Sequence, residues 1–160
     1  MDALKIQRFA HKLYLKRIPL IPSFLTRWIH FRYNSDIQPA TIIGGGTKLG
    51  HGGIGVVIHP KAEIGCNCLI AQNVTIADKD GGQPKLQDWV YVGHASIIMG
   101  DVTIGKNAFI GALSLVNKDV PDNAIVGGIP ARVIKYRSKE EIEDWHDWII
   151  RNNGISSNNV

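Results

Sequence analysis

A six-residue period in the central part of the chain most constrains how it can fold. Between residues 37 and 116 an apolar residue returns at nearly every sixth position, and a glycine or alanine often follows it. This period fits neither a 3.6-residue helix nor the two-residue alternation of a single strand. It fits a triangular solenoid in which each side contributes one inward apolar residue and then turns. The apolar positions are Ile37, Ile43, Leu49, Ile58, Ile64, Ile70, Ile76, Leu86, Val92, Ile98, Ile104, Ile110 and Val116. We therefore predict an all-β solenoid, a left-handed parallel β-helix of hexapeptide repeats.

The register of this period slips twice. The spacing is nine residues from Leu49 to Ile58 and ten residues from Ile76 to Leu86. Insertions in a solenoid form loops on its outside, and such loops often carry function. The first insertion contains His51, and the second, residues 78–84, has turn-forming residues throughout.

The chain divides into three parts by pattern: a helical segment over 1–34, the solenoid over 35–135, and a helix with a tail over 136–160. In the first part, Ile6, Phe9 and Leu13 recur at helical spacing among basic residues, and a second helix is expected from Phe24 after two prolines. We expect the apolar face of this segment to cover the open end of the solenoid. The alternative is contact with a membrane surface, as in other basic amphipathic segments.

The last part carries a helix-start signal. Ser138 and Glu141 have the spacing of a capping box. The following residues Ile142, Trp145, Trp148 and Ile149 form an apolar stripe. We expect this helix to pack on the solenoid or on a neighbouring subunit, and the tail from Asn152 to fray.

Composition excludes several classes of protein. The net charge of +4 is mild, and the only basic cluster is near the N-terminus, whereas a nucleic-acid binder would concentrate its Lys and Arg in a stripe with interleaved aromatics. Cys66 and Cys68 are too close in sequence for disulfide geometry and lack partners for a zinc site, so we expect two reduced thiols and no metal. Neither a run of about 18 apolar residues nor a signal-peptide pattern is present, and a cytoplasmic protein is expected.

Three segments together resemble a known family: residues 50–60 around His51, residues 82–86, and the closing motif of residues 127–134. They are similar to hexapeptide-repeat acyltransferases, most of all to serine acetyltransferases and their shorter relatives in bacterial polysaccharide biosynthesis. The resemblance covers about residues 35–135. It implies an acetyl-CoA-dependent O-acetyltransferase that works as a homotrimer, with acetyl-CoA in a groove between neighbouring prisms.

The resemblance also implies two catalytic residues. His51 matches the family's general base, and Asp36 matches the carboxylate that pairs with it. Separated by 15 residues, they are expected near one edge of the prism on adjacent turns. A neutral histidine suits the deprotonation of an attacking hydroxyl, and a carboxylate fixes its tautomer. Backbone N–H groups of the glycine-rich loop after His51 can stabilise the oxyanion. Because no nucleophile elbow is recognisable, direct transfer is favoured over an acyl-enzyme.

Cofactor-binding positions follow from the same resemblance. Ala95 and Ala112 fall where the family's backbone lines the coenzyme A groove, and Pro130 and Ala131 match the loop over the cofactor's far end. His94 stands where the family often has a small residue, and it either contacts coenzyme A or narrows the groove.

The chain departs from serine acetyltransferases at charged positions. Gly50 replaces an Asp before the catalytic His, and Gly82 and Gln83 replace an Arg-His pair in the projecting loop. A site for zwitterionic serine needs such charges. We therefore expect the acceptor to be a sugar hydroxyl in surface polysaccharide biosynthesis, with a basic N-terminus able to make weak peripheral contact with the inner membrane. The alternative acceptor is L-serine. Specificity for the acceptor is expected to come from the loop over 77–85 and the N-terminal segment.

Two other functions remain open on sequence alone. Carbonic anhydrases on the same fold bind zinc through three histidines, and His51, His59 and His94 are candidates, although the family's closely spaced pair is missing. A non-catalytic solenoid is the other possibility, with His51 as an ordinary loop residue.

Overall fold

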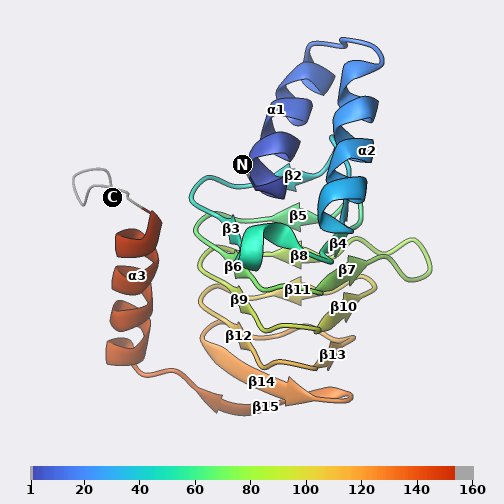
Figure 1. The fold of residues 1–160 in the computed structure, drawn as a ribbon. Helices are drawn as coiled ribbons and strands as arrows, with labels where there is room; N and C mark the ends of the chain where they lie inside the picture. The colour runs from blue at the N-terminus through green and yellow to red at the C-terminus, as the bar shows by residue number, and fades with distance from the viewer. Residues whose placement is uncertain (1, 154–160) are drawn as a thin grey trace.

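The computed structural model describes residues 2–153, whose centre is a parallel β-solenoid with three sheets (Figure 1). Sheet A contains β1 (Asp36–Ile37), β4 (Val57–Ile58), β7 (Thr75–Ala77), β10 (Ile97–Met99) and β13 (Leu115–Val116). Sheet B contains β2 (Ile42–Ile43), β5 (Glu63–Ile64), β8 (Lys85–Leu86) and β11 (Thr103–Ile104). Sheet C contains β3 (Lys48–Leu49), β6 (Leu69–Ile70), β9 (Tyr91–Val92), β12 (Phe109–Ile110), β14 (Ala124–Gly128) and β15 (Ala131–Tyr136). The predicted β-helix is confirmed.

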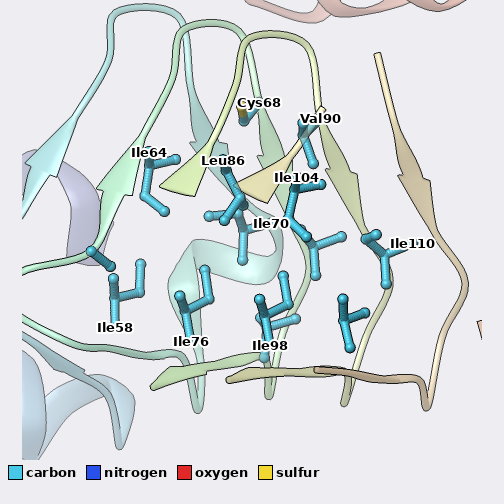
Figure 2. Packing of buried hydrophobic residues seen from close by; sticks show 14 of the residues in the cluster. Ile58, Ile64, Cys68, Ile70, Ile76, Leu86, Val90, Ile98, Ile104 and Ile110 are labelled. Atoms are coloured by element: carbon cyan, nitrogen blue, oxygen red, sulfur yellow. The ribbon is translucent and has the colours of Figure 1, made fainter. Parts of the chain in front are cut away.

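The periodic apolar residues form the core of the prism (Figure 2). In sheet A, Ile37, Ile58, Ile76 and Ile98 stack on successive turns with at most 1% of their surface exposed. Because each strand keeps one side chain inward, every turn adds three buried residues to a continuous column. The residues predicted from the six-residue period are therefore those that hold the solenoid together.

Glycines at the corners allow successive turns to approach closely. A Cβ placed on Gly93 would lie 2.5 Å from the amide nitrogen of Ala112 on the next turn, which is shorter than any allowed contact. The same crowding occurs at Gly44, whose Cβ would lie 2.5 Å from the carbonyl carbon of Gly65. These positions favour glycine because neighbouring backbone fills the space that a side chain needs.

Both register slips are outer segments, as predicted. The first contains a short 3₁₀ turn, η1 (Gly50–Gly53), between β3 and β4. The second, residues 78–84, leaves the C-terminal end of β7 and projects from the prism (Figure 1). His51 thus lies at a corner joining sheet C to sheet A, and the projecting loop lies at the opposite end of the sheet A strands.

Helix α1 (Ala3–Leu15) covers the open end of the solenoid, as expected. Leu4 belongs to the solenoid core, and buried Gln7 donates from Nε2 to the carbonyls of Gln38 (3.2 Å) and Thr41 (3.1 Å). These bonds satisfy backbone acceptors that the first turn would otherwise leave unpaired. The predicted apolar stripe is partly wrong, because Phe9 is 56% exposed. The buried residues of α1 are Ala3, Leu4, Ile6, Gln7 and Ala10.

Helix α2 (Ile21–Tyr33) begins earlier than the sequence suggested. Pro22 lies in its first turn, where a missing N–H costs no intrahelical bond, so the proline starts the helix instead of delaying it. Ile29 of α2 packs with Ala3 and Ile6 of α1 in a small second cluster. Within residues 2–153 the structure has no helix with the length and hydropathy needed to cross a membrane.

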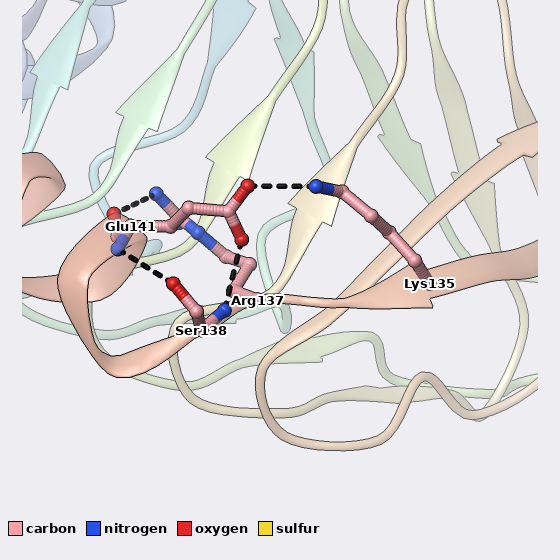
Figure 3. Close-up of polar contacts among 4 residues, drawn as sticks. All are labelled: Lys135, Arg137, Ser138 and Glu141. Carbon is pink, nitrogen blue, oxygen red and sulfur yellow. Dashed lines mark hydrogen bonds and ion pairs between the residues drawn. The ribbon is translucent and has the colours of Figure 1, made fainter.

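The other end of the solenoid closes with an antiparallel hairpin of β14 and β15, followed by α3 (Lys139–Asn153). The predicted capping box is present: Ser138 Oγ accepts from the Glu141 amide at 3.2 Å, and the Glu141 carboxylate accepts from the Ser138 amide at 2.8 Å (Figure 3). Glu141 also accepts a 2.7 Å bond from Lys135. The hydrogen bonds from the Lys135 side chain and the Ser138 amide, together with the charges of Lys135 and Arg137, hold the pKa of the Glu141 carboxyl below its usual range.

Helix α3 packs on the chain's own sheet C. Its Trp145 donates from Nε1 to the carbonyl of Trp89 (2.9 Å), and its His146 stacks on the Trp89 ring with centroids 4.0 Å apart. Ile149 is buried, whereas Trp148 at the outer side is 48% exposed. The frayed tail was expected from Asn152, but α3 includes Asn152 and Asn153, and the rest of the tail lies outside the described residues.

Candidate active site

The predicted site residues gather along one edge of the prism, where sheet C turns into sheet A. The corner that contains His51 follows β3 and precedes β4, Ala95 follows β9 and precedes β10, and Ala112 follows β12 and precedes β13. Because these strands stack in register, their corners stack as well.

Backbone hydrogen bonds join these corners from turn to turn. The Ala95 amide donates to the carbonyl of Gln72 (3.1 Å), and the Leu113 amide donates to the carbonyl of His94 (3.0 Å). Above them, a Cβ on Gly50 would lie 3.2 Å from the Cα of Ala71. Small residues therefore leave backbone near the surface along this edge, which is the geometry that lets a ligand approach the main chain.

His51 is exposed and adopts a left-handed conformation with φ of 49°. Gly52 and Gly53 after it also have positive φ, and Gly53 packs between Leu49 and Ala3 of α1. A left-handed residue followed by two such glycines turns the chain sharply, so the imidazole stays outside while the following backbone is tucked under α1. The cap helix and the glycines together fix the position of His51.

Asp36 begins β1 and is exposed at the same end of sheet A, one turn before Val57 of β4. Its Oδ1 accepts a 2.6 Å hydrogen bond from Nε2 of Gln38. Within the described part of the chain, no hydrogen bond or ion pair joins Asp36 to His51. This contact with Gln38 was not predicted from the sequence. The one indication in the sequence is that residues two apart in an extended chain lie on the same face.

The loop after His51 offers fewer amides for an oxyanion than its glycines suggested. The Gly55 amide donates to the carbonyl of Tyr33 at 3.0 Å, and the Val56 amide donates to Ser35 Oγ at 3.1 Å. These bonds anchor the loop to the end of α2. The amides of Gly55 and Val56 are therefore not available to an oxyanion.

Pro130 and Ala131 lie at the turn between β14 and β15, beyond the last corner of the same edge. The turn contains a cis peptide bond between Ile129 and Pro130, and Ile129 is 75% exposed. A Cβ on Gly111 would meet the carbonyl of Val126 at 3.2 Å, which places β14 directly under that corner. His51 and the four predicted cofactor positions therefore follow one edge in sequence order.

The histidines of the zinc alternative serve different parts of the fold. His59 accepts from the Lys61 amide at 3.4 Å, and its Nε2 lies 3.9 Å from a carboxylate oxygen of Asp78 at the root of the projecting loop. His94 is exposed on the edge that carries His51. Across residues 2–153, no group of three or more His, Cys, Asp or Glu side chains is placed to hold a metal ion.

The His51 corner is open to solvent in the single chain. A cavity of about 520 Å³ lies nearby between α1 and β3, and its lining includes Lys5, Arg8 and Lys48 but not His51. A ligand at His51 would thus have protein on one side only. A second surface is needed to enclose it, because ligand sites bury most of a ligand's area.

Comparison with known proteins gives a consistent result. No protein-family model matches the chain. It is 41% identical over 146 residues to a serine acetyltransferase of Synechococcus elongatus, covering 89% of this chain and 59% of that protein. It is 32% identical over 148 residues to that of Bacillus subtilis, covering 90% and 68%. A solved serine acetyltransferase in complex with CoA superposes with a TM-score of 0.76 at 32% identity, covering 82% and 55%.

The chain therefore spans a little over half to two-thirds of the length of these relatives. The matched part includes the solenoid, and the identity to the Bacillus subtilis enzyme extends over two-thirds of that protein. By this similarity, and by the left-handed β-helix that carries its candidate site, the chain belongs to the serine acetyltransferase family.

Proposed function

We propose that this protein transfers an acetyl group from acetyl-CoA to an acceptor hydroxyl, with His51 as general base. The observation that carries the proposal is the shared edge: the exposed imidazole of His51 lies at one end of it, and Ala95, Ala112 and the β14–β15 turn follow along it. A long, extended co-substrate fits such an edge better than an enclosed pocket. The solved relative in complex with CoA supports this donor.

The chemistry is a direct transfer. His51 takes the proton of the hydroxyl as its oxygen attacks the thioester carbonyl, and a tetrahedral oxyanion forms. When the oxyanion collapses, the carbon–sulfur bond breaks and the imidazolium returns the proton to the departing thiolate. The products are an acetyl ester and free coenzyme A. Asp36 orients and stabilises the imidazolium once its carboxylate turns from Gln38 towards His51.

The working form in this proposal is a homotrimer. The single chain leaves His51 on an open surface, and the projecting loop over 78–84 lies at the other end of sheet A. The projecting loop, which is expected to select the acceptor, can therefore reach the His51 of a neighbouring prism but not the His51 of its own chain. Packing of three prisms side by side brings each edge against a neighbour and encloses the groove.

The family favours L-serine as the acceptor, because the relatives at 32% and 41% identity are named serine acetyltransferases. A second candidate, a sugar hydroxyl, rests on Gly50, Gly82 and Gln83, which supply no charge for the ends of an amino acid. A cytoplasmic location belongs to the proposal too, since Cys66 and Cys68 are both free thiols.

Release of free thiol from acetyl-CoA tests the proposal. The purified protein is assayed with L-serine and, in parallel, with a panel of sugars. Saturable turnover with L-serine that His51→Ala abolishes supports the family's acceptor. His51-dependent turnover with a sugar alone supports the second candidate. Turnover that His51→Ala leaves unchanged contradicts the mechanism.

A further inference from the structure

The helical hairpin of α1 and α2 concentrates the positive charge of the chain. Residues 1–34 contain seven of the 18 Lys and Arg residues but one of the 14 Asp and Glu residues, so this segment carries +6 and the remainder −2. Its single acid, Asp2, caps the start of α1, at the end of the hairpin next to the solenoid. All the other charged side chains of the hairpin are therefore basic.

The hairpin also exposes a large apolar surface. On α2, Phe24, Trp28 and Phe31 follow one another at the spacing of one helix face, and they are 66%, 49% and 83% exposed. The rings of Trp28 and Phe31 have centroids 6.5 Å apart, so these two side chains adjoin. Arg27 and Arg32 are exposed in the same stretch of α2. Contiguous exposed apolar surface of this kind marks an interaction site.

The stripe continues into the hairpin tip, the segment 15–21 that joins the helices. Figure 1 shows this tip as the part of α1 and α2 farthest from the three sheets. Leu15 and Leu20 are 66% and 83% exposed there, next to the exposed Lys16 and Arg17. Apolar side chains beside long basic ones are arranged to enter a lipid interface while the charges stay at the headgroups.

We infer that the α1–α2 hairpin docks this protein on the surface of an anionic lipid bilayer. The apolar stripe of α2 and the tip bury in the interfacial region, and Lys16, Arg17, Arg27 and Arg32 contact acidic headgroups. Charge favours this partner over the hairpin of a second copy. Pairing two hairpins would bring +6 against +6, whereas an anionic bilayer is complementary to both the charge and the apolar stripe.

Co-sedimentation of the full chain with lipid vesicles tests the inference. We expect binding to phosphatidylcholine vesicles that contain about 30 mol% phosphatidylglycerol, and much weaker binding to phosphatidylcholine alone. Raising the salt concentration from about 0.05 M to about 0.5 M should release part of the bound protein. Salt screens the electrostatic attraction to the headgroups but leaves the apolar contribution to binding. Equal binding to both kinds of vesicle, or none, overturns the inference.

Matched variants locate the contact. Phe24→Ser with Phe31→Ser should weaken vesicle binding about tenfold or more, and Lys16→Gln with Arg17→Gln by roughly thirtyfold, at about fivefold per charge. The controls on the solenoid, Ile42→Ser for an exposed apolar residue and Lys61→Gln with Lys79→Gln for charge, should bind as the wild type does. Loss of binding in the controls as well contradicts a hairpin-specific contact.

A spectroscopic measurement separates the bilayer from a second copy. Trp28 is the one tryptophan of the hairpin, and brominated lipids should quench its fluorescence in a way that Trp28→Phe abolishes. If instead Phe24→Ser with Phe31→Ser changes the molar mass in light scattering and no quenching occurs, the stripe is a protein interface and the inference is wrong. Neither readout depends on acetyl transfer, so failure here is distinguishable from failure of the proposed enzyme activity.

Discussion

The Gln38 side chain donates a 2.6 Å hydrogen bond to the carboxylate of Asp36, the residue proposed to pair with His51. The carboxylate is thus held at the His51 edge by a neutral donor that leaves its charge intact. Because the Gln38 amide is uncharged, the Asp36 carboxylate can exchange this hydrogen bond for a stronger one to the His51 imidazolium when a substrate binds. Asp36 therefore lies at the same edge as the proposed base, and among residues 2–153 no ion pair engages it.

Replacement of Asp36 by Asn tests its role. The change keeps the shape of the side chain and removes the charge that stabilises the imidazolium, so kcat should fall by about 10²-fold or more. Gln38→Ala is the matched control, because it removes the positioning bond but keeps the charge, and its loss should stay within about tenfold. Wild-type kcat in Asp36→Asn would exclude Asp36 from the mechanism.

The corner glycines give a test of the fold. Gly44→Ala forces a Cβ to within 2.5 Å of the Gly65 backbone, whereas Gly45→Ala meets nothing within 4 Å. We expect Gly44→Ala to lower the free energy of unfolding by about 1–3 kcal/mol, and Gly45→Ala to change it by no more than about 0.5 kcal/mol. Chemical denaturation of both variants measures the difference. Equal effects would mean that the turns are not stacked as closely as the structure has them.

The two cysteines should differ in reactivity. Cys68 is buried in the solenoid core, and burial raises the pKa of its thiol to about 12, whereas Cys66 is exposed. Since the thiolate is the reactive form, a thiol reagent at neutral pH should modify one cysteine in the native protein and two after unfolding. Cys66→Ser should remove the fast reaction. Two fast reactions in the native state would place Cys68 outside the core.

The packing of α3 should depend on pH through His146. Its Nε2 lies 2.7 Å from Oδ1 of Asn107. Burial, and then the nearby charges of Lys106 and Arg137, lower the pKa of the imidazole below its ordinary value of about 6.5. Asp147 and Glu143 act in the opposite direction.

The sign of the effect follows from proton uptake. Below about pH 6.5 the unfolded chain binds a proton at His146 that the folded chain binds only at lower pH. The free energy of unfolding should therefore fall as the pH drops from about 6.5 towards the folded pKa, and His146 should contribute no slope above that window. His146→Gln should flatten this part of the urea-unfolding profile, whereas His30→Gln on the exposed face of α2 should not. An unchanged slope in His146→Gln would contradict the assignment.

The solenoid could be predicted because its signal is local and repeated. Each inward residue, such as Ile76, is followed by a corner. The six-residue period was therefore enough to predict both the core residues and the positions of the two outer insertions. The corner of His51 was found in the same way, as a break in the period. The stacking of Ala95 and Ala112 below it follows from parallel register once the turns are known.

The cap helix was harder because its buried face is chosen by tertiary contacts. Phe9 is apolar yet exposed, whereas polar Gln7 is buried, since the open end of the prism presents carbonyls that need a donor. A hydrophobic pattern cannot reveal that demand. The hydrogen bond from Gln38 to Asp36 is equally invisible in sequence, because it depends on side-chain rotamers at one corner.

The proposed role of His51 as general base for acetyl transfer is tested by kcat of His51→Ala. The assay follows thiol release from acetyl-CoA with the acceptor that supports wild-type turnover, and circular dichroism confirms the fold. We expect kcat to fall by about 10²-fold or more with an unchanged melting profile, and His30→Ala to keep full activity. Retention of wild-type kcat in His51→Ala would contradict it.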